Sequence, residues 1–321
     1  MKSFLEIATE FETHFAIQHF ANKPANLYNA AQYLLQLVGK RARPIVCLMG
    51  NELFDTIKPD TYHVATALEI FHNFSLVHDD IMDNAPLRRG VPTVHEKWNV
   101  PTAILAGDVM LVKCYEYINK IDKEVLHLIL LLFNRTAKEV CEGQQMDMDF
   151  ENRNDVTLPE YVEMITLKTS VLLAASIQLG AIMGGASDGN QQHLYEFGKN
   201  LGIAFQIQDD YLDAFGDPEK FGKLVGGDIL ANKKTFLLLH ALEVATGTEK
   251  EKLQHILHTN EPNKVDSMKA LYSQCNVDAW ALALKQKYFD IALQHLDDVA
   301  VLSKRKAPLL EVANFLIKRD Y

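Results

Sequence analysis

Two clusters of aspartates share one spacing in this sequence, and carboxylates at such a spacing can bind metal ions. The clusters are Asp79, Asp80 and Asp83, and Asp209, Asp210 and Asp213. On a helix that turns ~100° per residue, the first and last aspartates of each cluster lie one turn apart and ~40° round, with the middle one beside them. Three carboxylates therefore crowd one side of each helix, and either solvent or bound cations must relieve their repulsion.

The residues before each cluster favour cations over solvent. A lone acidic run is more often a solvated surface, but both clusters follow apolar segments, Phe74–Val77 and Leu201–Ile207, which indicate helices buried just below their acidic ends. Hard oxygen ligands without paired Cys or His favour Mg²⁺ over zinc. Because Mg²⁺ held by few carboxylates completes its shell with waters and substrate phosphates, the expected ligand is a phosphorylated molecule.

Basic segments accompany both clusters, as a diphosphate ligand would require. They are Gly39–Pro44, Pro86–Gly90, Lys168–Thr169, Gly222–Lys223 and Asn232–Thr235. Each alone is more often part of a solvated surface. Together with two acidic clusters in a chain with an apolar interior, they predict a pocket with a diphosphate end and a hydrocarbon end.

Helices must position these groups, because apolar residues recur at intervals of three and four and strict alternation is scarce. Leu126, Ile129 and Phe133 show the pattern. Thr157–Glu160 combines a capping hydroxyl, a proline in the first turn and a glutamate at the third helical position, which predicts the start of a helix that runs to Gly184. We therefore predict an all-α fold.

Short segments rich in turn-forming residues separate the helices. They are Asn84–Pro92, Gly184–Asn190, Gly216–Gly227 and Asn260–Asn263. Each is short enough to join neighbouring helices rather than domains. We predict a single domain over residues 1–321, although the length alone would suggest two.

The composition excludes several classes of protein. Of the 321 residues, 48% are hydrophobic and 23% charged, so the chain is not disordered. The net charge of −10 argues against nucleic acid and anionic membrane surfaces as partners. The cysteines lie far apart, the first residues do not resemble a signal peptide, and no run approaches ~18 apolar residues. We expect a cytoplasmic protein with no integral membrane segment.

At these same residues the chain resembles the trans-isoprenyl diphosphate synthases, also called polyprenyl synthetases, between Gly39 and Thr235. The motifs are GKRARP at 39, the block from Phe71 to Asp83, PLRRG at 86 with PTVH after it, AGD at 106, EGQ at 142, KT at 168, FQIQDDYLD at 205 and GKLVGGDILANKKT at 222. The resemblance implies a single bundle of antiparallel helices around a deep central cavity, three Mg²⁺ ions and a homodimer.

The resemblance also implies roles for individual residues. Asp79 and Asp83 would bind two Mg²⁺ ions from one wall of the cavity and Asp209 the third from the facing wall, supported by Asp80, Asp210 and Asp213. The residues expected to hold the allylic diphosphate are Arg88, Lys168, Lys223 and Lys233. Those expected to hold isopentenyl diphosphate, whose site uses no metal, are Lys40, Arg43, His72 and Arg89. Thr169 and Gln206 would lie near the breaking bond. The residues expected to be catalytic are Asp79, Asp80, Asp83, Arg88, Lys168, Thr169, Gln206, Asp209, Lys223 and Lys233.

A separate expectation attaches to each of Asn232, Asp228 and His72. Asn232 stands where many members of that family have glycine before the lysine. Asp228 is expected to pair with a lysine and is left out of the metal ligands. His72, taken without the resemblance, would be a core histidine with satisfied hydrogen bonds.

The resemblance implies a condensation reaction, for which we hypothesise the following steps. Metals and cations withdraw electron density from an allylic diphosphate of C5 to C15 until its carbon–oxygen bond ionises. The double bond of isopentenyl diphosphate attacks the cation, and the departing diphosphate accepts the proton. The apolar wall excludes water that would quench the cation.

Product length is inferred from the resemblance alone. Phe74 and Ser75, five and four positions before the first cluster, match residues that form a floor under the growing chain. An aromatic residue followed by a small polar one resembles the geranylgeranyl diphosphate synthases, so we expect a C20 product, with C15 (farnesyl) next. Helix geometry alone does not indicate Phe74 as part of the floor, because it lies ~140° from Asp79 around the helix axis, away from the carboxylates.

The sequence leaves three other functions open. A class I terpene cyclase shares the first cluster, but its second metal motif is of the NSE type. A non-catalytic subunit of a heteromeric prenyl synthase generally lacks one cluster or its arginines, and this chain has both. A helical calcium-binding protein would not require Arg88, Arg89 or the GKRARP segment.

Overall fold

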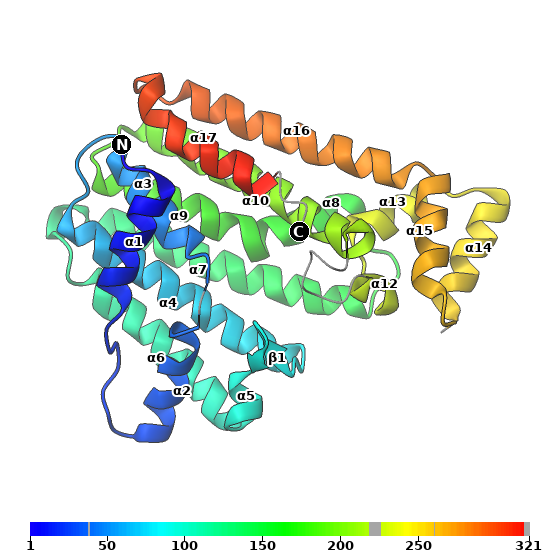
Figure 1. Ribbon diagram of the computed structural model, residues 1–321, viewed down its shortest axis with the longest axis horizontal. Helices are drawn as coiled ribbons and strands as arrows, with labels where there is room; N and C mark the ends of the chain where they lie inside the picture. Colours follow the sequence, from blue (N-terminus) through cyan, green and yellow to red (C-terminus); the bar gives the residue numbers. More distant parts are fainter. Residues whose placement is uncertain (38, 218–225, 260, 318–321) are drawn as a thin grey trace. The chain divides into compact units, whose positions relative to one another are not determined.

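Figure 1 shows the protein as a computed structural model, which describes residues 1–37, 39–217, 226–259 and 261–317. Helices make up nearly all of the regular structure in these ranges, so the all-α prediction is confirmed. The first helices are α1 (Phe4–Phe15), α2 (Ala25–Leu35), α3 (Ala42–Glu52), α4 (Pro59–Met82), α5 (Val94–Lys97), α6 (Val100–Ile118) and α7 (Lys123–Glu151), with strands β1 (Leu87–Arg88) and β2 (Val91–Pro92) between α4 and α5. They are followed by α8 (Leu158–Ile165), the π-helical turn η1 (Thr166–Ser170), α9 (Val171–Met183), α10 (Asp188–Phe215), α12 (Gly227–Leu230), α13 (Phe236–Val244), α14 (Gly247–His258), α15 (Lys264–Gln274), α16 (Val277–Asp298) and α17 (Ser303–Ile317).

By their contacts, the described residues form two compact units. Unit 1 comprises Met1–Arg135, Ala175–Leu194 and Val299–Leu309. Unit 2 comprises Thr136–Ala174, Tyr195–Asp298 and the segment from Leu310. Four of the five boundaries fall inside helices α7, α9, α10 and α17, and the fifth lies between the end of α16 and the connection to α17. The single domain over residues 1–321 stays a prediction.

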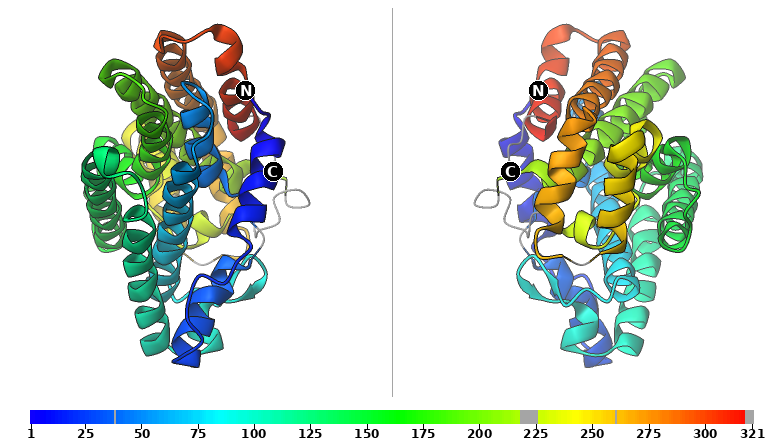
Figure 2. Two further views of the ribbon diagram at one scale, coloured as in Figure 1. Left: turned by 90° about the vertical axis from the view of Figure 1, so that its left-hand side faces the viewer. Right: turned by 90° about the vertical axis from the view of Figure 1, so that its right-hand side faces the viewer.

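Helix α4 carries the first acidic cluster at its carboxyl end and is anchored in unit 1 by apolar side chains. It packs along α6 and against α3, and Figure 2 shows α4 and α6 side by side. Leu68, Phe71 and Val77 are buried, and the ring centroid of Phe71 lies 5.3 Å from that of Phe133 on α7. Because these side chains fix the rotation of α4, they also fix the direction of its last turn.

A short hairpin follows α4, where the sequence predicted only a connection between helices. Strands β1 and β2 pair antiparallel, with Arg88 opposite Val91. The two turn residues, Arg89 and Gly90, have φ values of 53° and 79°, and a type I′ turn requires positive φ at both central positions. The turn therefore sets the directions of two neighbouring arginines.

Unit 2 contains the second acidic cluster, near the carboxyl end of α10. The predicted helix start is confirmed, because the Thr157 hydroxyl accepts the Glu160 N–H while the Glu160 carboxylate accepts the Thr157 N–H. That helix continues through η1 and α9 to Met183, one residue before the predicted end. Helix α13 packs against α8 and α16, and α14 pairs with α15, as Figures 1 and 2 show.

One helical run is long and apolar enough to cross a membrane, judged by length and composition. It spans Leu158–Met183, and the mean hydropathy of its most apolar window is 1.5. In the structure 72% of that window is buried, and the run includes Lys168. A core helix of a soluble protein has the same features, so the run is consistent with the expectation that the chain has no integral membrane segment.

Candidate functional site

The first acidic cluster has three carboxylates in three different environments. Asp80 is buried, with 1% of its side chain exposed, and Asp79 is 19% exposed. Asp83 follows the last residue of α4 and is exposed, and its N–H donates to the Asp79 carbonyl oxygen. The two outer aspartates of the cluster therefore reach the surface in part, while the middle one is enclosed by protein.

Arg88 neutralises the enclosed carboxylate. From the hairpin, its Nε donates to Oδ1 of Asp80 at 2.7 Å, and its Nη2 lies 3.4 Å from Oδ2 of Asp79. Burial raises the pKa of Asp80, although Arg88 acts in the opposite direction. Asp80 thus positions Arg88, the arginine predicted to hold the allylic diphosphate. Asp80 supports the cluster through this contact.

A group of basic side chains gathers around His72 in unit 1. Nη1 of Arg43 lies 3.2 Å from Nε2 of His72. Burial, and then Arg43 and Arg89, lower the pKa of His72 well below its usual value, so the imidazole is neutral. Because a guanidinium only donates, Nε2 accepts this hydrogen bond and Nδ1 carries the proton. The predicted Arg43, His72 and Arg89 are therefore neighbours, and Lys40 is exposed in the loop before α3.

Gly39 provides the space for Arg89. A Cβ added to Gly39 would lie 2.7 Å from Nη1 of Arg89 and 3.0 Å from its Cζ. Nη1 of Arg89 is 3.4 Å from the carbonyl oxygen of Leu37. The guanidinium thus lies directly against the backbone of the GKRARP loop, where no side chain could be accommodated without moving it.

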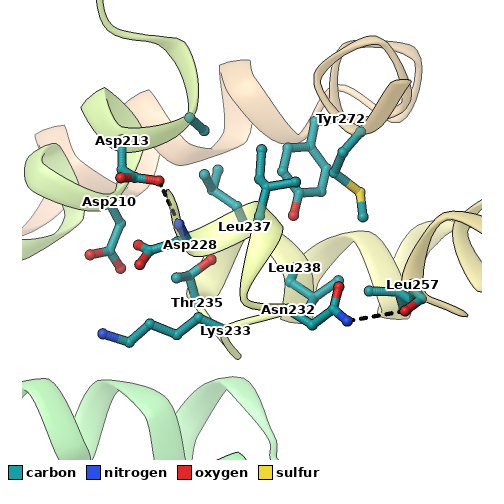
Figure 3. A pocket seen from close by; sticks show the side chains of 13 residues that line it. Asp210, Asp213, Asp228, Asn232, Lys233, Thr235, Leu237, Leu238, Leu257 and Tyr272 are labelled. Atoms are coloured by element: carbon teal, nitrogen blue, oxygen red, sulfur yellow. Dashed lines mark hydrogen bonds between the residues drawn. The ribbon is translucent and has the colours of Figure 1, made fainter. Parts of the chain in front are cut away.

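The second acidic cluster includes a fourth carboxylate that the sequence assignment left out. Oδ2 of Asp213 accepts the backbone N–H of Asp228 at 3.0 Å. Figure 3 shows the carboxylates of Asp210, Asp213 and Asp228 gathered in one pocket. Burial and the nearby Asp228 raise the pKa of Asp210 to about 7. The two glycines before Asp228 in GGDI could have indicated a tight turn that brings Asp228 to the cluster. Gly226 adopts a φ of 87°, a left-handed conformation that favours glycine.

This pocket has the donor set of a magnesium site. The described residues that line it offer carboxylate, amide and hydroxyl oxygens and include no Cys or His. Crowded carboxylates raise one another's pKa, and a bound cation would remove that penalty. Oxygen ligands with several negative charges fit Mg²⁺, as the sequence predicted.

Lys168 and Thr169 lie in the π-helical turn η1, which no sequence pattern predicted. The turn approaches α7 so closely that a Cβ on Gly143 would lie 2.2 Å from the backbone nitrogen of Lys168. Nζ of Lys168 pairs with Oδ2 of Asp147 at 2.6 Å. Burial alone would raise the pKa of Asp147, but Lys233 and Lys168 together lower it. Asp147 was missed, although it follows the EGQ motif by one helical turn.

Comparison with known proteins places the chain in a family. A sequence profile of the family described as polyprenyl synthetase matches residues 24–275. The chain belongs to the polyprenyl synthetase family. It is 40% identical over 314 residues to the geranylgeranyl diphosphate synthase of Saccharolobus solfataricus, covering 95% of this chain and 94% of that protein.

Two further members of the polyprenyl synthetase family are similar over nearly their whole lengths. The short chain isoprenyl diphosphate synthase of Methanothermobacter thermautotrophicus is 39% identical over 299 residues, which cover 93% of this chain and 92% of that protein. The crystal structure of a geranylgeranyl pyrophosphate synthase superposes with a TM-score of 0.94 at 42% identity and covers 99% of both chains. The predicted family and the isoprenoid synthase fold are confirmed, and membership implies Mg²⁺-dependent catalysis.

In this member of the polyprenyl synthetase family, the turn after Asp228 accommodates Asn232, which stands where many members have glycine. Asn232 adopts a φ of 50°, a left-handed conformation that asparagine tolerates better than most residues. Its Nδ2 donates to the carbonyl oxygen of Leu257 at 3.0 Å, as Figure 3 shows. Lys233 follows on the exposed side of the turn, whereas Lys223 lies outside the described residues.

The two residues expected to set product length differ in surroundings. Phe74 is 8% exposed, and its ring meets that of His78 edge to face at 4.9 Å between centroids. The Ser75 hydroxyl donates to the carbonyl oxygen of His72 at 2.8 Å, within its own helix. The aromatic ring is therefore held by a neighbour one turn along α4, and the serine hydroxyl is already satisfied.

Replacing Gly39 by alanine should weaken the binding of isopentenyl diphosphate, because the added Cβ displaces the Arg89 guanidinium. Loss of one charge-assisted contact predicts an increase in Kd of about tenfold. Isothermal titration without Mg²⁺ isolates the expected metal-free site. Gly189→Ala is the matched control, because nothing lies within 4 Å of its added Cβ. An unchanged Kd in Gly39→Ala would remove Arg89 from the site.

Proposed function

We propose that the protein is a trans-prenyltransferase that condenses isopentenyl diphosphate with allylic diphosphates of C5 to C15. Its product is a short-chain all-trans diphosphate. Geranylgeranyl diphosphate (C20) is the first choice for this product and farnesyl diphosphate (C15) the second. The observation that carries this proposal is that each acidic cluster lies near a cationic side chain, Arg88 for the first and Lys233 for the second. Lys168 pairs with Asp147, on which Lys233 also acts. Similarity to archaeal geranylgeranyl diphosphate synthases supports the substrates and the product.

The acidic side chains would hold three Mg²⁺ ions. Asp79 and Asp83 are the proposed ligands of two ions, and Asp209 of the third. Asp228 joins Asp213 and Asp210 as a support, because it shares their pocket. When bound, Mg²⁺ supplies positive charge at the diphosphate oxygens and so favours departure of the leaving group.

The cationic side chains bind the two diphosphates in different ways. Arg88, Lys168 and Lys233 offer fixed charges and donors to the leaving diphosphate. Arg43 and Arg89, with the neutral His72, offer donors to isopentenyl diphosphate without a metal. Attack by the double bond leaves a cation on the isopentenyl unit, and the diphosphate released from the allylic substrate accepts the proton lost from the adjacent carbon as the new double bond forms. The chain therefore needs no dedicated base.

Two further properties belong to this proposal. We expect the protein to act in the cytoplasm, on small diphosphates. We also expect a homodimer, because large apolar side chains are exposed along α6 and α7. They are Ile104, Leu105, Val112, Leu128 and Leu131, each between 43% and 57% exposed. Single exposed apolar residues are common, but a series of them on two successive helices marks an interaction surface.

Incubation with isopentenyl diphosphate, Mg²⁺ and C5, C10 or C15 primers, followed by chromatographic sizing, tests the function. A C20 product is expected as the main species. Asp79→Ala should stay folded and lose at least about a thousandfold in turnover, since a metal ligand is removed. Asp266→Ala, an exposed aspartate on α15, is the control. If no primer incorporates isopentenyl diphosphate, the cyclase or subunit alternatives are favoured instead.

Removing the Phe74 ring should lengthen the product. Phe74→Ala opens space beside His78 on α4, and we expect products longer than the wild-type product by one or more C5 units. Chromatographic sizing at equal total turnover separates this effect from a loss of activity. A product spectrum identical to that of the wild type would assign the floor to another residue.

Sedimentation velocity tests the homodimer. The wild-type protein should sediment at twice the chain mass of 36.3 kDa. A charge in the exposed apolar series, as in Leu105→Glu, should shift it to the monomer, because a buried unpaired carboxylate opposes association. Leu302→Glu, on a residue 66% exposed before α17, is the matched control and should stay dimeric. A monomeric wild-type protein would contradict the proposal.

A further inference from the structure

A chain of hydrogen bonds in unit 2 joins a buried tyrosine to the residues expected beside the breaking bond. The Thr169 hydroxyl in η1 lies 3.4 Å from Oε1 of Gln206 on α10. Nε2 of Gln206 donates to Oδ1 of Asp210 at 2.9 Å. The hydroxyl of Tyr161 on α8 donates to the other oxygen, Oδ2, of the same carboxylate. Four residues from three elements are thus linked in series.

The tyrosine end of this chain is fixed. Tyr161 is 2% exposed and belongs to the main apolar core of unit 2, where its ring centroid lies 6.2 Å from that of Phe236. Its backbone N–H donates to the Thr157 carbonyl oxygen at 3.0 Å, in the first turn of the helix that the Thr157–Glu160 capping box begins. Packing and capping together give the Tyr161 hydroxyl one position.

Asp210 transmits this position to Gln206. Asp210 is 7% exposed, and each of its two oxygens accepts one of the two hydrogen bonds. Because Oδ1 of Asp210 accepts from Nε2 of Gln206, the NH₂ group of Gln206 is directed at Asp210 and its carbonyl oxygen the other way. The hydroxyl of Thr169 lies on that side. The direction of the Gln206 carbonyl dipole therefore depends on a carboxylate held by Tyr161.

We propose that Tyr161 is a positioning residue for the prenyl transfer step. It holds Asp210 so that the carbonyl oxygen of Gln206 is directed to the region beside Thr169. This inference rests on the proposed function, which places the developing carbocation there. A fixed dipole directed at a developing charge accelerates ionisation because no reorganisation is needed when the charge forms. Asp210, the middle aspartate of its cluster, accordingly acts through hydrogen bonds to protein groups, while Asp209 is the proposed metal ligand.

The role of Tyr161 predicts a particular kinetic signature. Tyr161→Phe keeps the ring and its packing but removes the donor to Asp210. We expect kcat to fall about tenfold, the effect of losing one hydrogen bond to a charged group. The KM values for isopentenyl diphosphate and for the C15 allylic substrate should stay within about twofold, because none of the proposed diphosphate-binding side chains changes. Tyr288→Phe removes a hydroxyl from a tyrosine packed against the same core and should leave kcat unchanged.

A double-mutant cycle separates positioning from stability. Gln206→Ala removes the group that Tyr161 is proposed to direct, so adding Tyr161→Phe should cost little further kcat. Losses that multiply, or a Tyr161→Phe protein with wild-type kcat and a lowered Tm, would overturn the positioning role. Wild-type turnover is read in the same assay. Its absence would overturn the proposed function itself, whereas an active wild type with an unaffected Tyr161→Phe variant overturns only this inference.

Discussion

Repulsion between carboxylates is the constraint on which both acidic clusters depend, and the two units meet it differently. In unit 1 a guanidinium does so, since Arg88 binds the buried Asp80 directly. In unit 2 the buried Asp210 receives mainly neutral donors, from Tyr161 and Gln206, with Lys233 as a more distant charge. Dipoles offset a buried charge less completely than an ion pair. The second cluster therefore retains the stronger demand for a cation.

The distribution of the remaining acids decides which basic residues can bind a ligand. Arg41 and Arg43 are two positions apart in GKRARP, yet Arg41 is buried with Nη1 2.6 Å from Glu69 and Nε 3.1 Å from Glu12. These carboxylates neutralise Arg41, so it contributes structure rather than binding. Arg43 instead faces the neutral His72. Glu69 acts on Arg43 as well, but its ion pair is with Arg41. Because a diphosphate is attracted to the less neutralised charge, Arg43 rather than Arg41 is the proposed ligand-binding residue.

Local sequence was sufficient to predict the all-α fold, the capped start at Thr157 and the helical setting of the two acidic clusters, because each depends on residues close in sequence. The hairpin after α4 escaped prediction, since strands of two residues are too short to alternate. Asp147 and Tyr161 escaped for another reason. Their partners, Lys168 and Asp210, lie 21 and 49 positions away in the chain. Nothing local in a sequence distinguishes such a carboxylate or hydroxyl from one in solvent.

The π-helical turn shows why backbone irregularity limits prediction most at the site itself. A π turn inserts one residue into the helix, so every side chain after it is rotated by about 100° relative to a regular α-helix. The positions of Lys168 and Thr169 around the helix therefore cannot be obtained from the 3.6-residue period. What permits the turn is remote in sequence, because Gly143 on α7 leaves the space that the backbone of Lys168 occupies. The direction of Lys168, which we propose to be catalytic, is thus set by the absence of a side chain on another helix.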